Sequence, residues 1–169
     1  MTIRSAFDKN AEKKKRMKTH KLDQTDLAII RILQLDGRRR YADIATELGL
    51  APSTVQQRAT RLLEEGVIKM TALVDPVPLG YSVLAMIAIK ADGTKLREAA
   101  REIGQFPEVD YAVICTGSYD ILVEVACQSN DDLISLISDK LAKVNGVREI
   151  ETFLYLRVVK DSDQWAIPE

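Results

Sequence analysis

The chain of 169 residues can form one compact domain or two small ones, and its 46% apolar content excludes a chain that is disordered throughout. A formal net charge of −1 hides an uneven distribution: residues 1–21 carry +6, residues 22–75 carry −1 and residues 76–169 carry −6. This asymmetry is typical of an anion-binding end joined to a regulatory or assembly domain, and equally of a solvated basic tail.

Neither a membrane anchor nor a metal site is indicated. The first residues, MTIRSAFDKNAEKKKR, lack the apolar stretch of a secretory signal, and no window approaches the roughly 20 apolar residues that span a bilayer. The two cysteines, Cys115 and Cys127, and the single histidine, His20, do not have the spacing of zinc ligands. We therefore expect a cytoplasmic protein with free thiols and without a metal or another cofactor.

Three short helices are predicted in the first half of the chain, over residues 23–36, 41–48 and 52–65. Asp23 is a good N-cap for the first, Gly49 ends the second, and Pro52 opens the third. The third helix has an apolar stripe at i, i+4 and i+7 that should face the core, formed by Val55, Ala59 and Leu62.

The connection of only three residues between the second and third helices predicts a helix-turn-helix. The second helix of this motif can enter the major groove of DNA. Polar and basic side chains of that helix can donate hydrogen bonds to phosphates or read adenine and guanine, whereas the alternative is an ordinary solvated helix. The candidate DNA-binding residues are Ser53, Thr54, Gln56, Gln57, Arg58 and Arg61. Replacing Gln57 or Arg58 by alanine is predicted to weaken operator binding with little change in melting temperature.

Residues 67–74, VIKMTALV, are predicted to be extended, as a wing or a hinge strand. Two prolines and a glycine follow within six residues and indicate a domain boundary. The expected organisation is a basic tail (1–21), a DNA-binding domain with its wing (22–75), a linker (76–82) and a second domain (83–169).

The second domain has the order of a ferredoxin-like βαββαβ unit, so the expected fold class is α+β. Ser129, with Asp132 three residues later, is predicted to open the second helix of this unit. The predicted strands are residues 83–89, 109–116, 119–126 and 152–159, and the predicted helices are residues 95–104 and 129–144.

The strands VLAMIAI, YAVIC and ILVEVA are apolar at nearly every position. An antiparallel sheet that is covered on one face should instead alternate apolar and polar residues. Both faces of this sheet are therefore predicted to be buried, one under the two helices and the other under a second copy of the chain in a two-fold symmetric dimer.

The segment CTGSYD, residues 115–120, could be a catalytic cluster, a ligand clamp or a tight turn. Catalysis by Ser118 would need a base, and the sole histidine lies in the basic tail. As a turn, Gly117-Ser118 suits a two-residue hairpin in which Gly117 has positive φ. That register pairs Cys115 with Asp120 and places Cys127 opposite Glu108, which excludes a disulfide between the two cysteines.

The pattern LDxxDxxIIxxLxxDGRxxxxxIAxxLGLxxSTVxxRxxxLxxxGVI, followed by a βαββαβ unit that contains GSYD, resembles the Lrp/AsnC (feast/famine) family of transcription regulators. The resemblance covers the chain from Leu22 to about Lys160. It implies a sequence-specific regulator that dimerises through the sheet of its C-terminal domain and reads a pseudo-palindromic site in double-stranded DNA. Assembly to octamers, with amino acids or related metabolites bound between dimers, is also implied.

For the effector, the resemblance implies contacts from Gly117, Tyr119, Asp120 and Thr152. Asp120 would accept the ammonium group, and backbone N–H groups near Gly117 would hold the carboxylate. The chain departs from the family pattern at two positions. Ala51 stands where a capping serine is usual, so that Ser53 would have to supply the cap, and Ile150 stands where the family often has a second threonine.

Two alternatives to an effector-responsive regulator follow from the same features. One is an amino-acid-sensing protein that acts on a partner enzyme without binding DNA. The other is an effector-independent DNA-organising protein of the same fold. The polar third helix favours DNA binding over the first alternative.

Overall fold

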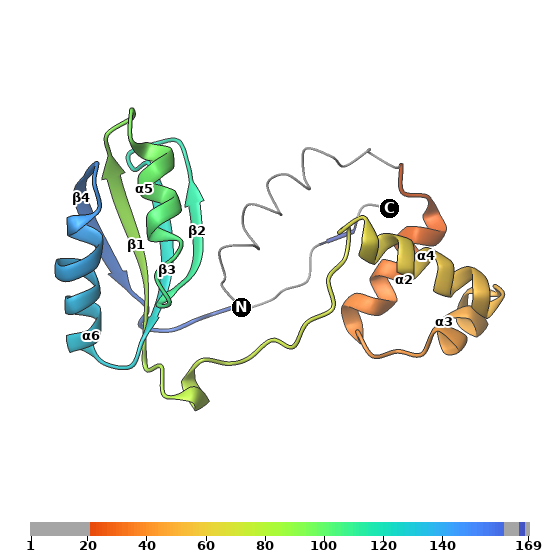
Figure 1. The fold of residues 1–169 in the computed structure, drawn as a ribbon. Coiled ribbons are helices and arrows are strands. Elements are labelled where there is room, and N and C mark those ends of the chain that lie inside the picture. The colour runs from red at the N-terminus through yellow and green to blue at the C-terminus, as the bar shows by residue number, and fades with distance from the viewer. Residues whose placement is uncertain (1–20, 161–165, 168–169) are drawn as a thin grey trace. The chain divides into compact units, whose positions relative to one another are not determined.

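The structure is a computed structural model that describes residues 21–160 and 166–167, so the predicted basic tail lies almost entirely outside the described residues. The described residues form two compact units (Figure 1). The N-terminal unit comprises the chain up to Leu73 and also the residues from Lys160 onward, and the C-terminal unit comprises Val74–Val159.

The N-terminal unit contains the three predicted helices: α2 (Gln24–Leu35), α3 (Tyr41–Leu48) and α4 (Pro52–Glu64). Asp23 caps α2 through a capping box, because its side chain accepts from the Asp26 N–H while the Asp26 side chain accepts from the Asp23 N–H. Gly49 ends α3 in the left-handed region with φ 66°, which suits glycine. These predictions are confirmed.

The core of the N-terminal unit lies between the three helices. The stripe predicted for α4 is fully buried, and Ile167 from near the end of the chain packs against the same cluster. Ala51 is the N-cap of α4 and no side chain caps this helix, so the compensating cap expected from Ser53 is not formed. The buried members of the cluster are Ile29, Ile30, Leu33, Ile44, Ala45, Val55, Ala59 and Leu62.

The strand predicted over residues 67–74 is wrong for this structure. Val67 and Ile68 fold back onto the end of α4, where their N–H groups donate to the Leu62 carbonyl. Residues 69–75 are exposed and form no ladder. A strand needs a hydrogen-bonding neighbour, which an apolar extended pattern cannot supply by itself. Beyond them, Val77–Leu79 forms one 3₁₀ turn that Gly80 ends.

The C-terminal unit has the predicted βαββαβ order around one four-stranded antiparallel sheet, with strand order β2-β3-β1-β4 (Figure 1). The helix after β3 continues through a π-helical turn (Leu136–Lys140) and a 3₁₀ turn (Leu141–Lys143). The elements are β1 (Val83–Ala91), α5 (Leu96–Ile103), β2 (Val109–Ile114), β3 (Ile121–Cys127), α6 (Asn130–Ser135) and β4 (Val147–Leu154).

The cap of α6 agrees with its prediction, whereas the start of the last strand does not. Ser129 caps α6 by accepting from the Asp132 N–H, as expected. The last strand, however, begins at Val147 rather than Thr152. Gly146, with φ 100°, turns the chain straight into β4, and the β1–β4 ladder runs from Ala91–Val147 to Ala85–Leu154. The prediction missed the polar first half of this edge strand.

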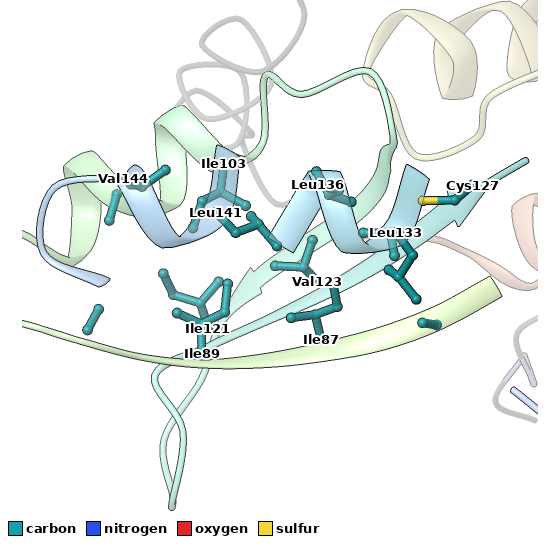
Figure 2. Close-up of a cluster of buried hydrophobic side chains, with 14 of the residues drawn as sticks. Ile87, Ile89, Ile103, Ile121, Val123, Cys127, Leu133, Leu136, Leu141 and Val144 are labelled. Atoms are coloured by element: carbon teal, nitrogen blue, oxygen red, sulfur yellow. The ribbon is translucent and has the colours of Figure 1, made fainter. Parts of the chain in front are cut away.

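One face of the sheet is sealed by the helices. Every second residue of β1 and β3 points to this face, and Figure 2 shows these side chains meeting those of α5 and of the α6 segment in one cluster. Its largest fully buried members are Ile87, Ile89, Ile103, Ile121, Leu136, Leu141, Val123 and Val125.

A bulge in β2 changes the register that was predicted for the β2–β3 hairpin. Ile114 pairs with Ile121 as expected, but the register shifts between Val109 and Tyr111. Ala126 therefore donates to the Glu108 carbonyl, and Cys127 does not lie opposite Glu108 as predicted. Neither cysteine forms a disulfide, which agrees with the expectation.

Candidate nucleic-acid interface and effector loop

Helix α4 presents two opposite faces. Because a helix repeats every 3.6 residues, positions 53, 57 and 60 fall opposite the buried stripe, and position 56 lies beside them. Ser53, Gln56, Gln57 and Thr60 are all exposed, and they form what we call the reading stripe. Thr60 was missed by the sequence interpretation, although its spacing of i+3 and i+4 from the two glutamines is a signal for it.

The other three candidates on α4 lie on its flanks. Thr54, Arg58 and Arg61 are half-buried, and the arginine side chains are 28% and 35% exposed. Both guanidinium groups turn toward the start of α2. The structure thus places three predicted DNA contacts on the exposed face and three beside the core.

The arginines of α4 bind two aspartates of the α2 N-terminus. Arg58 Nη1 donates to Asp23 Oδ2 at 2.6 Å and to Asp26 Oδ1 at 2.9 Å. Arg61 Nη2 donates to Asp26 Oδ2 at 2.6 Å. Asp26 is 1% exposed and is the only buried charged residue in the described part of the chain. We call these four side chains the Asp26 cluster.

Hydrogen bonding in this cluster favours the charged forms of Asp23 and Arg58. The hydrogen bond from Arg58, followed by that from the Asp26 backbone N–H, lowers the pKa of Asp23 below its ordinary value. Hydrogen bonds to Asp23 and then Asp26 raise the pKa of Arg58. The expectation that Arg58→Ala leaves the melting temperature nearly unchanged does not fit these contacts, because this substitution would break two ion pairs.

The effector candidates of the C-terminal unit centre on the loop between β2 and β3. Gly117 has φ 131°, as the turn prediction required, and the Cys115 N–H donates to the Asp120 carbonyl. Thr116 and Tyr119 make no backbone hydrogen bond to each other, so the connection is wider than the predicted two-residue turn. Cys115 Sγ donates to the Tyr119 carbonyl at 3.3 Å.

Asp120 fastens this loop to the end of β1. Its backbone N–H donates to the Ile89 carbonyl at 3.0 Å, and its Oδ2 accepts from the Ala91 N–H at 2.9 Å. No hydrogen bond from the described residues reaches Oδ1. The carboxylate therefore has a structural role, and its Oδ1 atom remains available to accept a further hydrogen bond.

The other effector candidates lie at different distances from Asp120 along the sheet. Tyr119 is beside the end of β1, where Lys90 Nζ lies 5.7 Å from its ring centroid. Thr152 is on β4, opposite Ile87 and across β1 from the loop. Gly117, Tyr119 and Asp120 thus gather in one loop, while Thr152 is separated from them. Ile150 packs against the core.

No helix within the described residues is long and apolar enough to cross a membrane. The same residues contain no group of three or more side chains suited to hold a metal ion.

Comparison with known proteins defines the class. A family model for winged helix-turn-helix DNA-binding domains matches residues 22–69, and a model for the Lrp/AsnC ligand binding domain matches residues 84–165. A DNA-binding unit followed by a ligand-binding unit is the organisation of a transcriptional regulator.

Individual proteins agree with this class. An HTH-type transcriptional regulator of Pyrococcus abyssi is 41% identical over 140 residues, which cover 82% of this chain and 89% of the relative. The structure of Escherichia coli AsnC superposes with a TM-score of 0.79 at 27% identity, over 87% of this chain and 99% of AsnC. A Neisseria meningitidis transcriptional regulator solved with L-Met has the same fold, with a TM-score of 0.79, 24% identity and coverage of 86% and 96%. The chain belongs to the Lrp/AsnC family of transcriptional regulators.

Proposed function

We propose that this regulator binds a pseudo-palindromic DNA site as a dimer and that an amino acid or related metabolite controls it. The observation that carries the DNA-binding part is the reading stripe. Four exposed, uncharged polar side chains occupy the outer side of α4, away from the fully buried stripe, and the exposed Glu64 follows them at the end of the helix. Their amide and hydroxyl groups can both donate hydrogen bonds to base edges and accept them.

Gln57→Ala is expected to weaken binding to the preferred DNA site by about fivefold or more, because a glutamine bidentate to adenine contributes this much discrimination. The melting temperature should stay nearly constant, since the side chain is exposed. A gel shift on a duplex selected from a random pool measures the effect. Gln105→Ala, at an exposed glutamine of the C-terminal unit, is the matched control. Unchanged affinity of the Gln57 variant would remove this residue from the interface.

The open face of the sheet supports the proposed dimer. The ladder registers place its central residues on the side away from the helices, and two of its aromatic side chains, Tyr111 and Phe153, are about half exposed at 51% and 47%. An apolar sheet face of this kind is normally covered. The apolar residues of this face are Leu84, Met86, Ala88, Tyr111, Val113, Leu122 and Phe153.

The charges on this face are compatible with burial. Glu124, near its centre, accepts a hydrogen bond from the Tyr155 hydroxyl at 2.9 Å. Burial, together with the hydrogen bond to Glu124 and its charge, raises the pKa of Tyr155 to about 12. Lys90 pairs with Glu149 at 2.7 Å at the margin. A largely apolar face with one hydrogen-bonded carboxylate and charged groups at its margin resembles the composition of interfaces between subunits.

The β2–β3 loop supports an amino-acid effector site. The Asp120 Oδ1 atom would accept the ammonium group, backbone N–H groups near Gly117 would bind the carboxylate, and Tyr119 would pack on the side chain. The L-Met complex of the Neisseria protein gives a precedent within the fold. Thr152 lies on β4, on the other side of β1 from this loop. It would therefore contact the effector either from that part of the sheet or from a second copy of the chain.

Asp120→Asn is expected to abolish the rise in melting temperature that a bound amino acid causes, while the protein without ligand melts nearly as the wild type does. The asparagine carbonyl oxygen can still accept from the Ala91 N–H, but the negative charge for the ammonium group is lost. Asp120→Ala would remove both functions and so could not separate them. A thermal-shift screen against all amino acids provides the measurement. A preserved ligand response in Asp120→Asn would contradict the assignment.

A further inference from the structure

We infer that Arg58 and Arg61 serve DNA recognition indirectly: through buried Asp26 they fix how α4 docks on α2, and they thereby aim an uncharged reading stripe at the bases. This inference rests on the proposed DNA-binding function. It assigns specificity to Gln56, Gln57 and Thr60 and makes Asp26 a positioning residue.

The ion pairs account for the orientation of both arginines. Arg58 Nη1 contacts both aspartates, and Arg61 Nη2 contacts the second oxygen of Asp26, so that both oxygens of this buried carboxylate are occupied by α4. Arg61 Nε is buried and has no hydrogen-bond partner. Arg61 thus has one nitrogen paired and a second buried, and both contacts of Arg58 go through Nη1, so the ion pairs hold the two guanidinium groups toward α2.

The cluster also has no net charge, because it contains two arginines and two aspartates. Its positive and negative charges largely cancel at the distance of a DNA phosphate, so it adds little attraction to the phosphates. Binding through phosphate neutralisation releases counterions, and each contact steepens the dependence of affinity on salt. The cluster is therefore not expected to contribute to this salt dependence.

The position of α4 on α2 determines where the side chains of the reading stripe point, because α4 moves as a rigid element. Asp26 contacts α4 at two positions that are three residues apart, which fixes both the rotation of the helix and its position along its axis. Buried side chains of α2 and α4 also pack against one another in the core of the N-terminal unit. Loss of the ion pairs would leave the reading stripe chemically intact but misdirected.

The side chains of the reading stripe predict which base pairs it contacts. Two neighbouring glutamines can each pair bidentately with the N6 and N7 edge of adenine, and a threonine can contact either a base edge or a thymine methyl. Arg58 and Arg61 line the same surface hollow as the stripe, but Asp23 and Asp26 bind their guanidinium groups, so the preferred half-site should be read mainly through A·T pairs rather than through arginine–guanine contacts.

The test uses the full chain and a duplex selected from a random pool, with a random duplex for comparison, at several salt concentrations. Asp26→Asn should lower affinity for the selected duplex by about tenfold or more, with little change for random DNA and an unchanged salt slope. A decrease in affinity is informative, because removal of a negative charge near DNA would by itself strengthen binding. Stronger binding to the selected duplex, or a steeper slope, would overturn the inference.

Arg58→Gln provides the second arm, and Asp23→Asn replaces Asp26→Asn if the latter does not fold. Each should reduce discrimination without changing the slope of log affinity against log salt. A fall of about 0.9 in that slope for Arg58→Gln would identify a phosphate contact and sink the inference. Arg101→Gln, at an exposed arginine of the C-terminal unit, is the control and should change neither quantity.

The outcome for the wild type separates this inference from the function on which it rests. If the wild-type chain binds selected and random duplexes alike, sequence-specific DNA binding itself fails. If the wild type discriminates but the arginine variants change the salt slope, only the indirect role of the arginines fails.

Discussion

Asp26→Ala is expected to lower the free energy of unfolding of the N-terminal unit by about 3 kcal/mol. The substitution removes a buried carboxylate, leaves the half-buried Arg61 without its ion-pair partner and Arg58 with Asp23 alone, and deletes one half of the capping box of α2. Their partial exposure keeps the loss at the lower end of the range for broken buried pairs. Urea denaturation followed by far-UV circular dichroism provides the measurement.

Asp43→Ala is the matched control for this prediction. Asp43 binds Arg40 at 2.9 Å, but the two side chains are 38% and 81% exposed. An exposed pair of this kind contributes little to stability, because solvent screens it. If the two variants lost similar stability, burial would not be the reason for the importance of Asp26.

Leu122→Arg is expected to convert the proposed dimer to monomers and to lower affinity for a two-fold symmetric DNA site by about 100-fold. Leu122 lies on the open face between Val113 and Ala88, so that a dimer would bury the introduced charge without a partner. A monomer also loses the second half-site. Sedimentation velocity and gel shifts with the full chain measure the two effects.

Ile134→Arg serves as the control for this interface. Ile134 is 60% exposed on α6 and does not belong to the sheet. The same change in charge should leave this variant dimeric. Retention of the dimer in Leu122→Arg would refute burial of the open face by a second copy.

Local patterns in the sequence were sufficient for most of the fold. Helices α2, α3 and α4 were predicted to within about two residues, because capping residues, glycines and apolar stripes all lie within the segments they define. The predicted order of elements in the C-terminal unit was correct for the same reason. The strand over residues 67–74 and the start of β4 were wrong, because both depend on which backbone lies alongside.

Less of the candidate site than of the fold could be predicted from the sequence. Arg58 and Asp26 are 32 residues apart, and no periodicity indicates that they meet. Arg58 does stand four residues before buried Leu62, and this position on the flank of the apolar stripe could have signalled a contact with the core side. The hydrogen bond from the Ala91 N–H to Asp120 likewise spans 29 residues and follows from the sheet register, not from the motif GSYD.

That last hydrogen bond gives the protein a spectroscopic reporter of its own. The Ala91 amide proton points at the carboxylate proposed to hold the effector, and it belongs to a residue that is only 8% exposed. We expect its nitrogen and proton chemical shifts to change when a ligand's ammonium group binds the same carboxylate. Occupancy of the loop is therefore readable at one backbone resonance, without a label on the ligand.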